Sequence, residues 1–232
     1  MPKPNESNQL RMLLRSKCWL IGVAVTVSML SGCGTTSAIP DARKPGPSQA
    51  PVSAAPSSTT IAPLPTAQAG SQLDPQSQKS YQAALAAMQN NQDANAEGML
   101  AAVLKAHPEF VEARTNLGIV LFRLGRYARA EEELKRVVVD DPKNIVAYNY
   151  LGIVYRINGQ FPQSKNMYMQ ALSINANYAN AQLNLGILYD LYLRELPSAL
   201  ESYQRYQKLQ PQEDKEVAKW IADLKRRIET GK

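Results

Sequence analysis

The fold is decided by residues 111–144, VEARTNLGIVLFRLGRYARAEEELKRVVVDDPKN. Within this stretch the tripeptide Leu-Gly-Ile occupies residues 117–119, and it returns at residues 151–153 and 185–187, so that each step is 34 residues. A fixed period of this length is the signature of a repeat architecture, in which each repeat is one supersecondary unit stacked on the next. The sequence therefore predicts a stack of at least three similar units.

Each unit is predicted to contain two helices. Apolar residues recur at spacings of three and four, which buries one stripe of an amphipathic helix. Gly125 and Gly159 stand where the first helix of a pair must end, because glycine readily adopts the left-handed conformation found there. Pro162 and Pro197 suit the first turn of a second helix, where no backbone N–H is needed. These signals predict an all-α fold.

A helix-turn-helix unit of this period resembles the tetratricopeptide repeat. Residues 111–144 carry that family's characteristic residues at the matching places, namely Leu117, Gly118, Gly125, Ala130, Leu134 and Pro142. The resemblance implies a right-handed superhelix, or α-solenoid, of about four helix pairs and a C-terminal capping helix. The implied boundaries are four repeats within residues 74–213, at 77–110, 111–144, 145–178 and 179–213, followed by the capping helix and tail at 214–232.

Two of the four copies depart from the pattern. Residues 77–110 lack both glycines, as is common at the end of an array. Residues 179–213 hold one extra residue between Gly186 and Ala199, so we expect an altered turn there. The segment after the last repeat has an apolar stripe, which we expect to cover the open face of that repeat. The stripe consists of Val217, Trp220, Ile221, Leu224 and Ile228.

The first 32 residues are predicted to be a signal peptide. A basic stretch that ends at Lys17 precedes thirteen largely apolar residues, which are too few to cross a bilayer that needs about 20. The run closes on Leu30-Ser31-Gly32-Cys33, which resembles the lipobox of bacterial lipoproteins. The resemblance implies that Cys33 becomes the first mature residue and carries fatty acyl chains such as palmitate. The alternative is an ordinary signal peptide that Cys33 merely follows.

Residues 33–73 are predicted to be a disordered tether, because they are rich in Pro, Ser and Ala and hold few charges. Gly34 occupies the second mature position, where enteric-type lipoproteins that stay in the inner membrane carry aspartate. By this resemblance we expect the chain to be lipid-anchored in the outer membrane and to face the periplasm. Two or more acyl chains would hold it there durably.

Composition argues against several classes of protein. The formal net charge is +6, and residues 1–32 alone hold four basic residues against one acidic residue, so the repeats lack the concentrated basic face that nucleic acid selects. The cysteines, Cys18 and Cys33, both precede the repeats, and His107 is the one histidine, so no zinc shell is expected. No catalytic motif is present. We expect no enzyme activity, no metal, no cofactor and no small-molecule substrate.

The concave side of a solenoid is an extended binding surface. By resemblance, the first helix of each repeat lines it and supplies the candidates for peptide binding. These candidates are Tyr81, Asn116, Ile119, Arg123, Asn149, Ile153, Arg156, Asn184, Ile187 and Asp190. We expect the asparagines to hydrogen-bond an extended segment or helix of a partner, and the arginines to pair with an acid. For the three isoleucines, simple packing inside the fold is an equal alternative.

The sequence thus predicts a scaffold for protein–protein interaction. Our first hypothesis is an adaptor or assembly factor for an envelope machine, since the chain resembles in architecture the repeat lipoproteins of pilus, secretion or cell-wall systems. A second hypothesis is a structural component that assembles with itself through the tyrosine-rich last repeat, and a third is a regulator of an associated enzyme. The tyrosines that motivate the second are Tyr189, Tyr192, Tyr203 and Tyr206.

Overall fold

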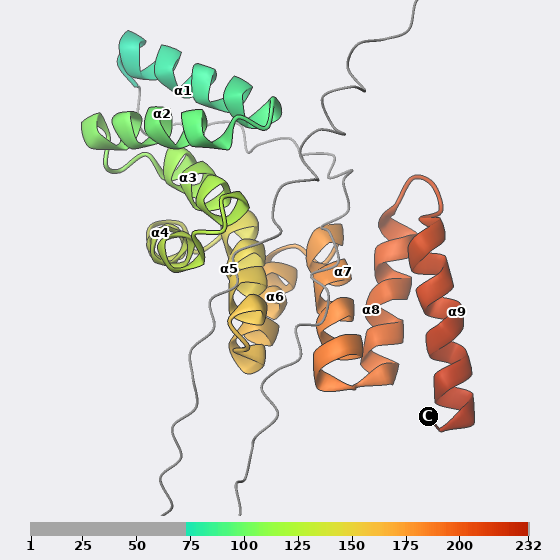
Figure 1. Ribbon diagram of the computed structural model, residues 1–232. Helices are drawn as coiled ribbons and strands as arrows, with labels where there is room; N and C mark the ends of the chain where they lie inside the picture. Colours follow the sequence, from blue (N-terminus) through green and yellow to red (C-terminus); the bar gives the residue numbers. More distant parts are fainter. Residues whose placement is uncertain (1–72, 232) are drawn as a thin grey trace, which may run out of the picture. The chain divides into compact units, whose positions relative to one another are not determined.

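The computed structural model describes residues 73–231, and within that range every regular element is a helix (Figure 1). The helices are α1 (Pro75–Gln89), α2 (Asp93–Ala106), α3 (Val111–Arg123), α4 (Tyr127–Asp140), α5 (Ile145–Ile157), α6 (Phe161–Ile174), α7 (Ala179–Ile187), the π-helix η2 (Leu188–Leu193), α8 (Leu196–Leu209) and α9 (Lys215–Thr230). The predicted all-α class is confirmed.

The helices stack in pairs. Helix α1 packs on α2, α3 on α4, α5 on α6 and α7 on α8, and each pair meets the next through α2 and α3, α4 and α5, or α6 and α7. The first helices also touch one another, α3 with α5 and α5 with α7. This arrangement is the α-solenoid of four helix pairs that the repeats predict, with α9 packed on α8 at its end (Figure 1).

The two turn glycines act as predicted. Gly125 and Gly159 each have φ of +73°, a conformation that a side chain would strain. After α3, the Gly125 N–H donates to the Phe122 carbonyl at 3.0 Å and the Arg126 N–H donates to the Leu121 carbonyl at 2.9 Å. These two bonds satisfy carbonyls that the helix end would otherwise leave without partners.

A second set of glycines sets how closely the two helices of a pair approach. A Cβ on Gly118 would lie 2.6 Å from Leu134 Cγ, one on Gly152 would lie 2.4 Å from Tyr168 Cε1, and one on Gly186 would lie 2.5 Å from Tyr203 Cδ1. All three large side chains are buried. Each pair is therefore closed by a large side chain of the second helix seated on a glycine of the first.

The extra residue of the last repeat is absorbed by η2. In this π-helix the Arg194 N–H donates to the Tyr189 carbonyl, and Arg194 ends it in the left-handed region with φ of 58°. A single π turn is the usual way for a helix to hold one additional residue without losing its hydrogen bonds. The altered turn that the spacing predicts is therefore a π-helix, and it brings Asp190 into the buried interior.

Asp74 and His107 join the start of α1 to the turn after α2. The Asp74 carboxylate accepts from the backbone N–H groups of Gln76 and Ser77 and lies 2.8 Å from His107 Nε2. Hydrogen bonds from Ser77 and then His107 hold the pKa of Asp74 well below its usual range. The same contact with Asp74, with Glu109 adding a smaller effect, raises the pKa of His107 above its ordinary value.

This contact is expected to depend on pH with a definite sign. The raised pKa of His107 stabilises the fold below the unfolded value near 6.5, and that contribution is lost as pH rises through the folded pKa. The lowered pKa of Asp74 stabilises the fold above about pH 4, and that contribution is lost only as pH falls through the folded pKa of Asp74. An NMR titration of His107 should give a midpoint above 6.5 that moves toward it in Asp74→Asn. Asparagine is chosen because it can still cap α1, so the variant removes only the charge. An unchanged midpoint would contradict the pairing of Asp74 with His107.

Helix α9 buries a narrower stripe than the sequence predicts. Val217 and Leu224 are buried, but Trp220 and Ile228 are exposed by 39% and 38%. The expectation of one continuous covering stripe is therefore wrong for these two residues. The reason is that α9 packs mainly on one helix, α8, so only the side chains that face α8 are enclosed, and Trp220 lies at the edge with its ring 5.5 Å from that of Tyr203.

The predicted signal peptide, Cys33 and nearly all of the predicted tether lie outside the described residues. Among the helices that the structure describes, none combines the length and apolar character needed to cross a membrane.

Candidate interaction surface

The ten candidate residues all belong to the first helices of the pairs or to η2, which continues α7. We call the surface formed by these ten residues the inner face. Since the first helices of neighbouring pairs touch one another, their facing side chains meet across the repeats. The structure shows which of these side chains are already engaged by the fold and which remain available.

The N-terminal part of the inner face is used by the fold itself. Asn116 is 1% exposed and its Nδ2 donates to the Tyr81 hydroxyl at 2.9 Å, while Ile119 is buried in the core around them. Tyr81 packs edge-on against Phe110, and burial raises the pKa of its hydroxyl to about 12. These three candidates join α1 to α3.

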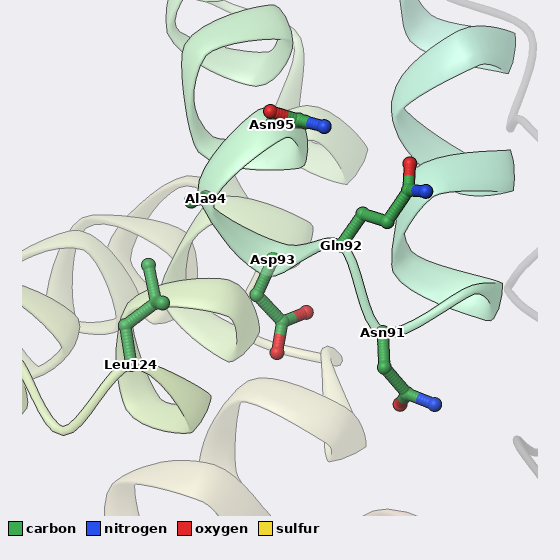
Figure 2. Close-up of a pocket in the computed structure, with 6 residues that line it drawn as sticks. All are labelled: Asn91, Gln92, Asp93, Ala94, Asn95 and Leu124. Atoms are coloured by element: carbon green, nitrogen blue, oxygen red, sulfur yellow. The ribbon is translucent and has the colours of Figure 1, made fainter. Parts of the chain in front are cut away.

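Arg123 is held by the first pair. Its Nη1 donates to the Met88 carbonyl at 3.2 Å and to Asp93 Oδ1 at 3.3 Å. Figure 2 shows Asp93, the first residue of α2, near Asn91 and Gln92 of the turn before it, with Leu124 across from them, around an open depression. The side chains drawn there point in different directions and do not converge on one point (Figure 2). Arg123 therefore ties the end of α3 to this turn.

The middle of the inner face is less fully engaged. Asn184 Nδ2 donates to Asn149 Oδ1 at 3.0 Å, and Asn149 is buried. Ile153 and Ile187 are half-buried, and each packs on a different part of the core: Ile153 on the cluster of Tyr168, Leu185 and Leu188, and Ile187 on the cluster around Tyr203. Both isoleucines therefore pack inside the fold, and the rest of their apolar surface stays accessible beside a polar pair.

Arg156 lies at the end of α5 in this middle region. Its guanidinium is 5.7 Å from the centre of the Tyr192 ring, a cation–π distance. Its Nε is buried and has no hydrogen-bond partner among residues 73–231, and no carboxylate of that range lies within ion-pair distance. The hydroxyl of Tyr168 adjoins this guanidinium: burial raises the pKa of Tyr168, and the charge of Arg156 acts in the opposite direction.

Asp190 is paired with the capping helix. It is 8% exposed and accepts from Arg227 Nη1 at 2.7 Å, so α9 reaches over α8 to η2. Arg227 is not among the ten candidate residues that the sequence predicts. Its Lys225-Arg226-Arg227 run carries no signal that marks one arginine as different.

One regularity was available in the sequence and was missed. The two side-chain pairs Tyr81–Asn116 and Asn149–Asn184 both join residues 35 apart, so each links the same two positions of successive repeats.

The tyrosines of the last repeat are also engaged internally: Tyr203 is buried, Tyr192 packs on Phe161, and the Tyr206 hydroxyl donates to Asp214. Residues 73–231 contain no cluster of histidine, cysteine and acidic side chains that would bind a metal ion.

Comparison with known proteins agrees with this geometry. Residues 81–145 and residues 145–178 each match a family model described as tetratricopeptide repeat. The N-terminal acetyltransferase A complex auxiliary subunit of Arabidopsis thaliana is 30% identical over 115 residues, which are 47% of this chain but only 12% of that subunit. The chain therefore corresponds to a small part of that protein.

Solved structures share the fold. The crystal structure of the MamA protein is similar with a TM-score of 0.52 at 27% identity, covering 58% of this chain and 73% of that one. The pilF protein of Pseudomonas aeruginosa has a TM-score of 0.60 at 19% identity, covering 66% of this chain and 69% of its own. Residues 81–178 are thus tetratricopeptide repeats within an α-solenoid, a scaffold for binding proteins or peptides.

Proposed function

We propose that this chain is a lipid-anchored adaptor or assembly factor of the bacterial envelope. In this proposal Cys33 is acylated and holds the chain at the outer membrane, and the repeats face the periplasm. The middle of the inner face binds an extended segment or helix of another envelope protein that belongs to a pilus, secretion or cell-wall system. No catalytic step is part of the proposal.

The observation that carries the binding part is the open middle of the inner face. Ile153 and Ile187 are half-buried on adjacent first helices, and Arg156 beside them has no acidic partner among the described residues. By contrast, the N-terminal candidates Tyr81, Asn116 and Ile119 are buried and pack or hydrogen-bond within the fold. A partner that covered this region would bury apolar surface and supply the missing acceptor.

The observation that supports the anchor is the sequence Leu30-Ser31-Gly32-Cys33 after a short apolar run. An apolar run of this length suits a cleaved signal better than a membrane span. A tether of about forty residues rich in proline would span roughly 35 Å as a flexible coil, and about 120 Å when extended. The repeats could therefore work at a distance from the lipid surface.

Site-specific crosslinking in a diderm bacterium tests both parts together. A photoreactive amino acid replaces Ile157, which is 40% exposed one turn beyond Ile153, in the full chain with Cys33 or with Cys33→Ser. We expect the chain with Cys33 to fractionate with the outer membrane and to give one discrete protein adduct. We expect Cys33→Ser to leave the membrane fraction and to lose that adduct.

The matched control places the same photoreactive residue at Met169 on α6, which is 51% exposed on a second helix. Equal adducts from both positions would count against binding at the inner face. A chain that remains in the cytoplasm with Cys33 unmodified by mass spectrometry would refute the anchor.

A further inference from the structure

We infer that Arg156 is the anion-recognition residue of the inner face, and that it binds a carboxylate of the partner segment. This inference rests on the proposed function and specifies the chemistry of the partner: an acidic group flanked by apolar side chains. The carboxylate can belong to an aspartate or glutamate side chain or to a chain terminus, since both present the same two oxygen atoms.

The other charges of the inner face are already neutralised within the fold. Arg123 donates to Asp93 and to the Met88 carbonyl. Asp190 accepts from Arg227 of the capping helix. Among the charged candidates of the inner face, Arg156 alone forms no ion pair within residues 73–231.

Arg156 lies where pairing with an acid would be strong. Its side chain is half-buried between α5, α6 and η2, against the ring of Tyr192 and near the hydroxyl group of Tyr168. Charge-assisted hydrogen bonds gain strength where water is partly excluded, and a guanidinium presents two parallel N–H donors to one carboxylate. The contacts with the two tyrosines also restrict the rotamers of the arginine, so less entropy is lost when the acid binds.

Exposed apolar side chains occur on both elements that meet at Arg156. Ile157 on α5 is 40% exposed, and Leu191 on η2 is 60% exposed. A partner segment that carries apolar residues beside its carboxylate would satisfy the arginine and bury apolar surface of α5 and η2.

The competing role for Arg156 is purely structural, with the cation–π contact holding η2 against α5. The two roles differ in one measurable respect. A structural role would weaken the binding of every peptide alike when Arg156 is replaced. Recognition of an acid would weaken only the binding of peptides that carry the acid, so a Glu→Gln change in the peptide distinguishes them.

The experiment selects ten-residue random synthetic peptides on the full chain in detergent, from one library with free C-termini and one with amidated C-termini. We expect enrichment of glutamate or aspartate next to apolar residues in both libraries, or of a free C-terminus in the first alone. For a selected acidic peptide, Arg156→Gln should weaken binding by about 10- to 100-fold, and Glu→Gln in the peptide should then have no further effect.

Arg205→Gln on α8 is the matched control, because Arg205 is an exposed arginine whose one ion pair among residues 73–231 is with Glu201 on the same helix. It should leave affinity and acid preference unchanged, while Arg156→Lys should keep the preference with lower affinity. Selected peptides without acid enrichment, or Arg156→Gln chains that retain full acid preference, would overturn the inference and leave inner-face binding intact. Failure to select any peptide would overturn the proposed function, and this inference with it.

Discussion

Replacement of Gly152 by alanine is expected to destabilise the repeats by about 1–3 kcal/mol, the usual cost of forcing one extra carbon into a packed core. The added Cβ would lie 2.4 Å from Cε1 and 2.6 Å from Cδ1 of Tyr168, whose ring is fully buried. A rigid ring cannot bend away, so α5 and α6 must separate. At Gly118 the obstacle is the flexible end of Leu134, so Gly118→Ala should cost less.

Gly98 supplies the matched control for this prediction. It is an exposed glycine inside α2, and no atom of the described residues would contact an added Cβ within 4 Å. Gly98→Ala should therefore stabilise the chain by about 0.5–1 kcal/mol through helix propensity and a less flexible unfolded state. Urea unfolding followed by circular dichroism measures both changes. A stabilising or neutral Gly152→Ala would contradict the close approach of α5 and α6, and its cost should fall when Tyr168 is replaced by leucine.

Loss of the Asp190–Arg227 ion pair is expected to loosen the C-terminal end of the solenoid. Asp190 is 8% exposed, and Arg227→Met would leave its carboxylate without the 2.7 Å partner that satisfies it. An unpaired buried acceptor of a charged hydrogen bond costs about 1.5–3 kcal/mol. Because repeats in a solenoid interact mainly with their neighbours, the loss should concentrate in α9, α8 and η2.

Hydrogen exchange followed by mass spectrometry can locate that effect. We expect faster exchange in α9 and η2 of the Arg227→Met chain and little change in α1 to α4. Arg226→Met is the control, since Arg226 is an exposed neighbour that pairs, within the described part of the chain, only with Asp223 on the same helix. It should change stability by less than about 0.5 kcal/mol. Equal effects of the two substitutions would show that the contact with Asp190 adds nothing.

Most of the fold was predictable because the sequence signals that specify it are local. The 34-residue step, the glycines at 125 and 159 and the prolines at 162 and 197 each act on their own backbone, so their meaning does not depend on distant residues. The close packing at Gly118, Gly152 and Gly186 was also predictable, because a large partner residue follows each glycine at nearly the same distance, at Leu134, Tyr168 and, one residue later because of the extra residue, Tyr203. The choice of the inner face as the interaction surface came from the family resemblance, and it stays a prediction.

The availability of each inner-face residue was not predictable. Asn116, Asn149 and Asn184 are polar residues on the predicted face, yet their hydrogen-bond partners are decided by how neighbouring repeats stack. The extra residue before Ala199 predicts a changed turn. It does not predict that this turn is a π-helix, or that Asp190 is buried there and pairs with Arg227. Both partnerships depend on the approach of helices that are distant in sequence.

For this protein, the sequence by itself determined the repeated helical hairpins, their turns and the glycines that let each pair close, because those features act over one helical turn or one repeat. Only the tertiary structure decided which charges of the inner face are neutralised and which remain open. The reason is geometric: a side chain finds its partner through the packing of whole helices, and a displacement of a few ångströms separates a paired arginine from an unpaired one.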